Sequence, residues 1–318
     1  MEIRKLQLIG GSSYMISLPK RWVKENGLDQ GDELILQVDG CVVKIFPKKS
    51  VENVFKVKID RIPSVEDKFL RRFIYALYIQ GPDEIVIEDT ISPRVITKLG
   101  EIVRDLIGME IIDVADGRIV MKCLLSTQDF DVKGVLKRMC QIIMEMMDVI
   151  EEFIRRGNPS ALDVIPKLEE EADRFYLLAL RLEHRLLREI SCPARWDELK
   201  QLLGMRLIAK LLEKVADALY DTSEFVAEWR DREILPVLLD LRRVFRMVLE
   251  SYFEGDVLEC ENGIEMAEDL EERILNIRSS KEGAPCKLAL ESLLEACRHV
   301  KSIGEIAFNK AVRETFSV

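Results

Sequence analysis

Long hydrophobic runs, histidine pairs and closely spaced cysteines are missing from this sequence. Only two of its 318 residues are His, and neither lies in a Ser, Cys or Asp pattern suited to nucleophilic catalysis, so we expect no enzymatic activity. The seven cysteines occur singly and never as CxxC, which argues against a disulfide framework or a thiolate metal cluster. No stretch reaches the roughly 18 apolar residues of a spanning helix, and the N-terminus lacks a signal-peptide pattern. We therefore expect a cytoplasmic protein without membrane insertion.

Charge is unevenly distributed along the chain. The formal net charge of the whole chain is -10, yet residues 1–49 contain eight Lys and Arg against six Asp and Glu, a net charge of +2. The N-terminal segment is therefore the part of the chain that is suited to approach an acidic polymer such as DNA.

Three segments differ in their hydrophobic pattern. Residues 1–49 have the pattern of short strands and turns, residues 50–127 alternate strand and helix, and residues 128–318 have apolar residues at three- and four-residue steps. Helix-breaking residues divide the last segment into two halves of three helices, about 128–232 and 233–318. We predict a multidomain α+β chain with an N-terminal β module, a small α/β middle domain of unknown role and an all-α bundle of two three-helix repeats.

The N-terminal segment is too short to enclose a core of its own. Its last two predicted strands are joined by Asp39-Gly40, a strong signal for a two-residue hairpin turn. Below about 50 residues, burial of apolar surface rarely offsets the loss of chain entropy without a partner, a metal or a disulfide. We therefore expect this segment to form a homodimer.

Two acidic motifs, LEEEAD and LEKVAD, occur on consecutive predicted helices. Glu169 and Asp173 in the first motif, and Glu213 and Asp217 in the second, are four residues apart and so lie on one helix face beside the core positions. If the helices face each other, a bound cation would relieve the repulsion among four carboxylates, and such oxygen ligands suit Mg, Mn or iron, with Zn also compatible. The alternative is a solvated acidic surface, because a chain with 57 Asp and Glu repeats this spacing by chance.

These motifs resemble the LEEEID-type and LERIGD-type motifs of the PhoU family of phosphate-signalling proteins. The resemblance covers roughly residues 130–318. It implies that Glu169, Asp173, Glu213 and Asp217 are metal ligands. It also implies a divalent or trivalent metal cofactor, such as a multinuclear iron or zinc cluster on the surface of the bundle.

The second half of the bundle matches the family less closely. Glu268 and Glu272 in MAEDLEERIL keep a carboxylate pair, and Glu305 in SIGE resembles the end of the second motif, so these three residues are further candidate ligands. The first acidic position of that motif is Lys301, however, and an ammonium group has no lone pair for a metal. We expect the second site to be weakened or lost.

The N-terminal segment is similar to the AbrB/SpoVT swapped-hairpin domain, in which two chains interleave into one DNA-binding barrel. The similarity lies in RKL near the start, SLPKR, GDE and the closing KIFP. Because contacts from Lys and Arg to phosphate dominate DNA affinity, we predict DNA contacts from Arg4, Lys5, Lys20, Arg21 and Lys24. The alternatives are a solubilising basic edge or a module that only dimerises.

The combination of AbrB-like and PhoU-like parts in one chain resembles archaeal regulators of phosphate uptake. They imply a homodimer that couples phosphate status to transcription through its DNA-binding module. A second reading is an adaptor that controls a phosphate transporter ATPase or a sensor kinase by protein contact, with the N-terminal module serving only for dimerisation. A third makes the bundle a metal store or a metal-dependent switch.

Overall fold

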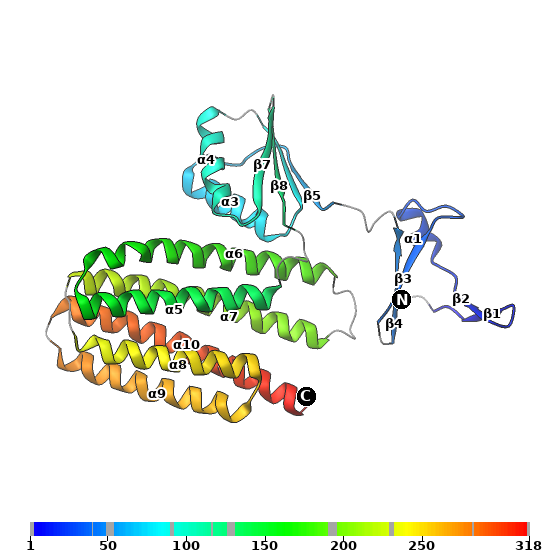
Figure 1. Ribbon diagram of the computed structural model, residues 1–318. Helices are drawn as coiled ribbons and strands as arrows, with labels where there is room; N and C mark the ends of the chain where they lie inside the picture. The colour runs from blue at the N-terminus through cyan, green and yellow to red at the C-terminus, as the bar shows by residue number, and fades with distance from the viewer. Residues whose placement is uncertain are drawn as a thin grey trace. The chain divides into compact units, whose positions relative to one another are not determined.

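The structure of the chain is a computed structural model in which two compact units are defined (Figure 1). One unit ends at Val54, and the larger one begins at Phe55. The predicted domain boundaries at 49/50 and 127/128 lie outside the described residues and stay predictions. The structure describes residues 3–39, 41–48, 54–89, 92–115, 117–125, 131–189, 196–228, 232–281 and 283–316.

The N-terminal unit consists of two separate antiparallel hairpins and a short helix. Gly10 and Gly11 have φ angles of 61° and 75°, which only glycine adopts readily, and they form the turn between the first two strands. β1 pairs with β2, and β3 pairs with β4. The elements are β1 (Gln7–Ile9), β2 (Ser13–Met15), α1 (Lys20–Glu25), β3 (Leu34–Asp39) and β4 (Val42–Pro47).

Apolar side chains of this unit remain largely exposed. Leu28 is 9% exposed, whereas Tyr14, Leu36 and Val38 are 71%, 64% and 74% exposed. A monomeric soluble unit rarely leaves so many large apolar side chains in water. These strands therefore present an apolar surface that a second chain or another partner would cover.

The next segment is a four-stranded sheet with two helices packed on one face. The strand order is β5-β6-β8-β7; β5 and β6 run parallel, and the other neighbours are antiparallel. Leu70 and Ile74 of α3 and Leu99 of α4 are completely buried against the sheet residues Ile87 and Met121. The elements are β5 (Lys56–Ile59), α3 (Asp67–Ile79), β6 (Glu84–Glu88), α4 (Pro93–Arg104), β7 (Met109–Ala115) and β8 (Arg118–Cys123).

Helix starts in this segment agree only in part with the sequence signals. Helix α4 begins at Pro93 after Ser92, as the Ser-Pro pair predicts. Ser64, with Asp67 three residues on, predicts a helix that starts at Ser64, but α3 begins at Asp67 with Glu66 as its N-cap residue. Ser64 instead accepts a hydrogen bond from the backbone N–H of Glu66 at 3.3 Å, so its hydroxyl stabilises the preceding turn rather than the helix end.

The C-terminal segment is a bundle in which two successive sets of three long helices lie side by side (Figure 1). The two long helices α7 and α10 pack against each other where the two sets meet. This arrangement confirms the predicted fold class: a β-hairpin module, a small α/β segment and a helical bundle. The elements are α5 (Val132–Arg156), η1 (Pro159–Val164), α6 (Ile165–Glu189), α7 (Trp196–Glu228), α8 (Ile234–Glu254), α9 (Val257–Ser280) and α10 (Ala284–Phe316).

Local sequence explains where several of these helices begin and end. Asp256 caps α9 by accepting a hydrogen bond from the backbone N–H of Glu259 at 2.8 Å. Gly157 and Gly255 end α5 and α8 in the left-handed conformation, with φ angles of 73° and 81°. None of the described helices combines the length and the apolarity needed to cross a lipid bilayer.

Three arginines of α6 attach the α/β segment to the bundle. Arg181, only 2% exposed, donates hydrogen bonds to the carbonyl oxygens of Tyr78 at 2.9 Å and Pro82 at 2.7 Å. One turn further along, Arg185 forms an ion pair with Asp83, and the guanidinium of Arg188 lies 3.5 Å from the ring centroid of Phe55. The Tyr78 carbonyl lies in the last turn of α3, and Pro82 follows that helix end, where the helix dipole favours a positive charge. The segment and α6 therefore form one continuous structure.

Candidate functional site

The two acidic motifs lie on α6 and α7, which pack side by side. In the first motif Leu168 and Ala172 are buried in the bundle core, and in the second Leu212 and Ala216 are buried there. Glu169 and Asp173 directly follow the first two core residues, and Glu213 and Asp217 directly follow the other two. The core packing of the two helices therefore places the acidic side chains along the seam between them.

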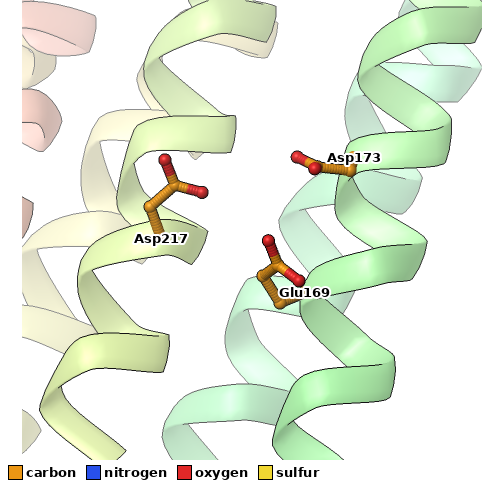
Figure 2. Close-up of side chains that lie close together, drawn as sticks. All are labelled: Glu169, Asp173 and Asp217. Carbon is orange, nitrogen blue, oxygen red and sulfur yellow. The ribbon is translucent and has the colours of Figure 1, made fainter. Parts of the chain in front are cut away.

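Three of the four predicted carboxylates converge. One carboxylate oxygen from each of Glu169, Asp173 and Asp217 lies within 4.8 Å of the others (Figure 2). Figure 2 shows the two α6 side chains facing Asp217 across the gap to α7. In the part of the chain that the structure describes, no other group of three or more His, Cys, Asp and Glu side chains comes as close.

The convergence disfavours the ionised form of the carboxyl groups on α6. Desolvation, followed by the nearby charges of Asp173 and Asp217, raises the pKa of Glu169 from 4.5 to about 7. Desolvation and the charges of Glu213 and Asp217 raise the pKa of Asp173 from 3.8 to about 6, although Lys210 and Lys214 oppose this rise. At neutral pH the site therefore holds negative charge against an electrostatic cost.

The fourth predicted ligand, Glu213, lies beside this group and is paired with lysines. The residue is 9% exposed. Its carboxylate oxygen Oε2 lies 2.7 Å from Lys210 Nζ and 3.6 Å from Lys214 Nζ. Lys214 also donates a hydrogen bond to Asp217 at 2.7 Å, and this bond raises the pKa of Lys214. The acidic motifs did not predict these two lysines as components of the site, although each lysine lies three residues before the carboxylate that it pairs with.

The acidic side chains of the site outnumber its lysines. Glu169, Asp173, Glu213 and Asp217 carry four negative charges when ionised, and Lys210 and Lys214 supply two positive charges. The remaining two negative charges equal the charge of one divalent cation. The oxygen atoms that converge are of the kind that hard and intermediate metal ions prefer.

The corresponding residues of the second half are arranged differently. Glu268 lies 3.9 Å from Lys301 Nζ, and Lys301 donates a hydrogen bond at 3.1 Å to Glu271, which also accepts one from Arg298 at 2.8 Å. Basic side chains thus occupy the space between α9 and α10 that carboxylates occupy between α6 and α7. The other candidate ligands of this half, Glu272 and Glu305, are exposed and lie outside the converging group.

The five predicted DNA contacts all lie on the surface of the N-terminal unit. Arg4 and Lys5 precede β1, whereas Lys20, Arg21 and Lys24 belong to α1, and all five are exposed. Arg21 forms an ion pair with Glu25 of the same helix at 2.7 Å. That pairing offsets part of the positive charge, so α1 offers a modest basic surface.

Two segments of the chain match known family models. Residues 136–226, which contain both acidic motifs, match the family model of the PhoU domain. This part of the chain is a PhoU domain. Residues 7–53 match the MazE family model, described as antidote-toxin recognition MazE, bacterial antitoxin, so the N-terminal unit is a MazE/AbrB-like domain. The two domains together support a phosphate-related regulator.

Similarity beyond these two domains is limited. The crystal structure of PhoU from Pseudomonas aeruginosa aligns with 10% sequence identity and a TM-score of 0.47, covering 60% of this chain and 98% of that chain. No curated protein matches the chain. The roles of the acidic site and of the basic residues in the N-terminal unit therefore rest on the geometry of this chain.

Proposed function

We propose that this protein regulates phosphate uptake, binding a metal ion in its PhoU domain and DNA through its N-terminal domain. The proposal rests above all on the convergence of Glu169, Asp173 and Asp217 within a PhoU domain. A separate basic module on the same chain supplies a route from such a sensor to transcription. As a dimer, the protein would contact DNA with two copies of that module.

The donor set fits a metal ion. The three converging carboxylates and the lysine-paired Glu213 provide oxygen ligands for iron, Mn or Mg, and Zn is also compatible. A bound cation would offset both the desolvation and the repulsion that raise the pKa values of Glu169 and Asp173. It would also supply a fixed positive charge that ties α6 to α7, and the state of this helix pair would then depend on occupancy.

Metal content tests this part of the proposal. In a Glu169→Gln, Asp173→Asn, Asp217→Asn variant, which keeps the side-chain shapes, elemental analysis of the purified protein should show loss of most bound metal. A matched Glu268→Gln, Glu272→Gln variant should keep it, because Glu268 is paired with Lys301 and Glu272 is exposed. Equal metal content in all three proteins would remove the metal from the proposal.

DNA binding is supported by the charge distribution and by the domain family. Residues 1–49 carry a net charge of +2 in a chain of -10, and the five predicted contact residues among them are exposed. A dimer would present ten such groups. Binding through these contacts would be strongly salt-dependent, because each neutralised phosphate releases condensed counterions.

Binding to the promoter of a phosphate transporter operon, measured as salt is increased, tests the DNA contacts. An Arg4→Ala, Lys5→Ala, Lys20→Ala, Arg21→Ala variant should bind more weakly and with a shallower salt dependence than the intact protein. An Arg155→Ala, Arg156→Ala variant, which removes exposed arginines of α5, serves as the control. If the intact protein and the four-alanine variant bind alike, the adaptor reading replaces the DNA-binding one.

A further inference from the structure

A groove between α7 and α10 differs in its charges from two other surface hollows of the larger unit. Its cavity of about 190 Å³ lies between the N-terminal half of α7, the C-terminal half of α10 and Tyr252 near the end of α8. The charged residues that line it are all basic, namely Lys200, Lys310 and Arg313. Hollows between α3 and α4 and between α8 and α9 are lined by charges of both signs.

The floor and one edge of this groove are apolar. Met205, Leu207 and Ile306 line it, and Leu207 is 56% exposed. Leu203, one turn before Leu207 on α7, is 58% exposed. Large apolar side chains flanked by basic groups are suited to a ligand that is itself apolar on one side and acidic on the other.

Gly204 provides a second, independent observation. This glycine lies inside α7, where glycine costs about 1 kcal/mol relative to alanine. A Cβ atom at this position would meet only Ile306, at an ordinary contact distance of 3.8 Å. The packing of the chain itself thus gives no reason for a glycine here, whereas a side chain seated in the groove from outside would use the space.

Basic and aromatic groups extend the groove toward the start of α5. Lys310 lies 5.2 Å from the ring centroid of Tyr252, which stacks edge-on against Phe253. Lys133 and Lys137 lie 5.8 and 5.3 Å from the Phe253 ring. Lys310 also forms an ion pair with Glu314 at 3.0 Å, which offsets part of the positive charge of the groove.

We propose that this groove docks an acidic amphipathic helix of a partner protein. A groove between two antiparallel helices accepts a third helix, whose apolar stripe would pack on Leu207 and Ile306 around Gly204. Acidic residues flanking that stripe would face Lys200, Lys310 and Arg313. DNA would leave the apolar floor without a partner, and a lipid surface is too flat to fill a concave site. The inference goes beyond the proposed function and requires neither metal nor DNA.

Selection from a displayed library of 18-residue amphipathic helices, with randomised flanks, tests the proposal on the full chain. We expect selected peptides to be rich in Asp and Glu beside the apolar stripe. Gly204→Leu, which fills the groove, should weaken their binding by about ten-fold, or 1.4 kcal/mol. Gly204→Ala is the matched control and should change binding by less than about three-fold, since a methyl group occupies little of the space.

Thermal unfolding and two further ligands complete the experiment. Gly204→Leu should be at least as stable as the intact protein, because leucine favours the helix more than glycine does. Arg313→Glu should also weaken the selected peptides. A selected pool without acidic enrichment, or unchanged binding to Gly204→Leu, would overturn the proposal. So would a loss in these variants of binding to DNA or to anionic phospholipid vesicles instead of the peptides.

Discussion

At the residue scale, the acidic site combines side chains that repel one another with lysines that only partly neutralise them. Glu169 and Asp173 retain raised pKa values even though Lys210 and Lys214 are close. Such an arrangement destabilises the metal-free protein at neutral pH, because the carboxyl groups lose their protons less readily in the folded than in the unfolded chain. A site that is strained when empty gains more from a cation than one whose carboxylates are already paired.

The pH dependence of stability follows from this argument. A folded-state pKa above the unfolded value stabilises the protein below the unfolded pKa, and that stability is lost as pH rises through the folded pKa. For Glu169 the window runs from 4.5 to about 7. Urea unfolding in the presence of a chelator should therefore show a contribution from Glu169 that falls across this range.

Removing the charge of Glu169 should remove that contribution. At pH 7 and without metal, Glu169→Gln should be more stable than the intact protein by on the order of 0.5 kcal/mol, since one like-charge pair on the helix is lost. The pH profile should become flatter between pH 5 and 7. Glu272→Gln, an exposed carboxylate of the second half, is the control and should leave the profile unchanged. A less stable Glu169→Gln protein at pH 7 would contradict the repulsion argument.

At the element scale, α6 carries two different sets of contacts along its length. Its first half bears the carboxylates Glu169 and Asp173, and its second half bears Arg181 and Arg185, which attach the α/β segment. Gly81, whose φ is 81°, allows the chain to pass close to Arg185, because a Cβ atom there would lie 2.7 Å from its Cγ. A displacement of α6 at the acidic site would therefore also move the arginines that contact the α/β segment.

Arg181→Leu should break this attachment. The substitution removes the side-chain donor to the carbonyl oxygen of Pro82, whereas that of Tyr78 keeps the backbone N–H of Gly81 at 3.0 Å, and an unsatisfied buried polar group costs about 1 to 3 kcal/mol. We expect a loss of about 3 kcal/mol in denaturant unfolding and faster amide exchange in residues 78–83. Lys167→Leu is the control, because Lys167 is an exposed residue in the first turn of α6 and its substitution should cost less than about 1 kcal/mol. Equal exchange rates in both variants would show that Arg181 does not hold the segment in place.

At the scale of the whole molecule, the chain joins a small β unit with little enclosed core to a large unit with an extensive one. Among the residues that the structure describes, fifty buried side chains from six long helices form the bundle core, whereas the N-terminal unit leaves Leu36 and Val38 mostly exposed. The larger unit therefore needs no partner for its core. The smaller one gains much of its stability only when its strands are covered.

Leu36→Asp should weaken association between chains through the N-terminal unit. A carboxylate buried between two apolar surfaces would have to leave water without a partner. Sedimentation of the full chain should show a shift from dimer to monomer, and the salt dependence of promoter binding should fall to about half. Leu258→Asp on α9 is the control, because Leu258 is 76% exposed and belongs to the bundle. An intact protein that sediments as a monomer would remove the predicted dimer.

Local sequence patterns were sufficient to predict the secondary-structure class of each segment and the helix face that carries each acidic motif. Residues four apart lie on the same face of a helix, one turn apart. The spacing alone therefore places Glu169 beside Asp173, and Glu213 beside Asp217, before any tertiary contact exists. The convergence of Glu169 and Asp173 with Asp217 required the tertiary structure, since those distances depend on how α6 and α7 pack. The Lys210–Glu213 pair, in contrast, lies within α7 at a three-residue spacing. The Arg181 attachment joins residues about a hundred positions apart, and the groove at Gly204 joins α7 to α10. No local pattern specifies either, because each depends on side chains that meet only after the helices have packed.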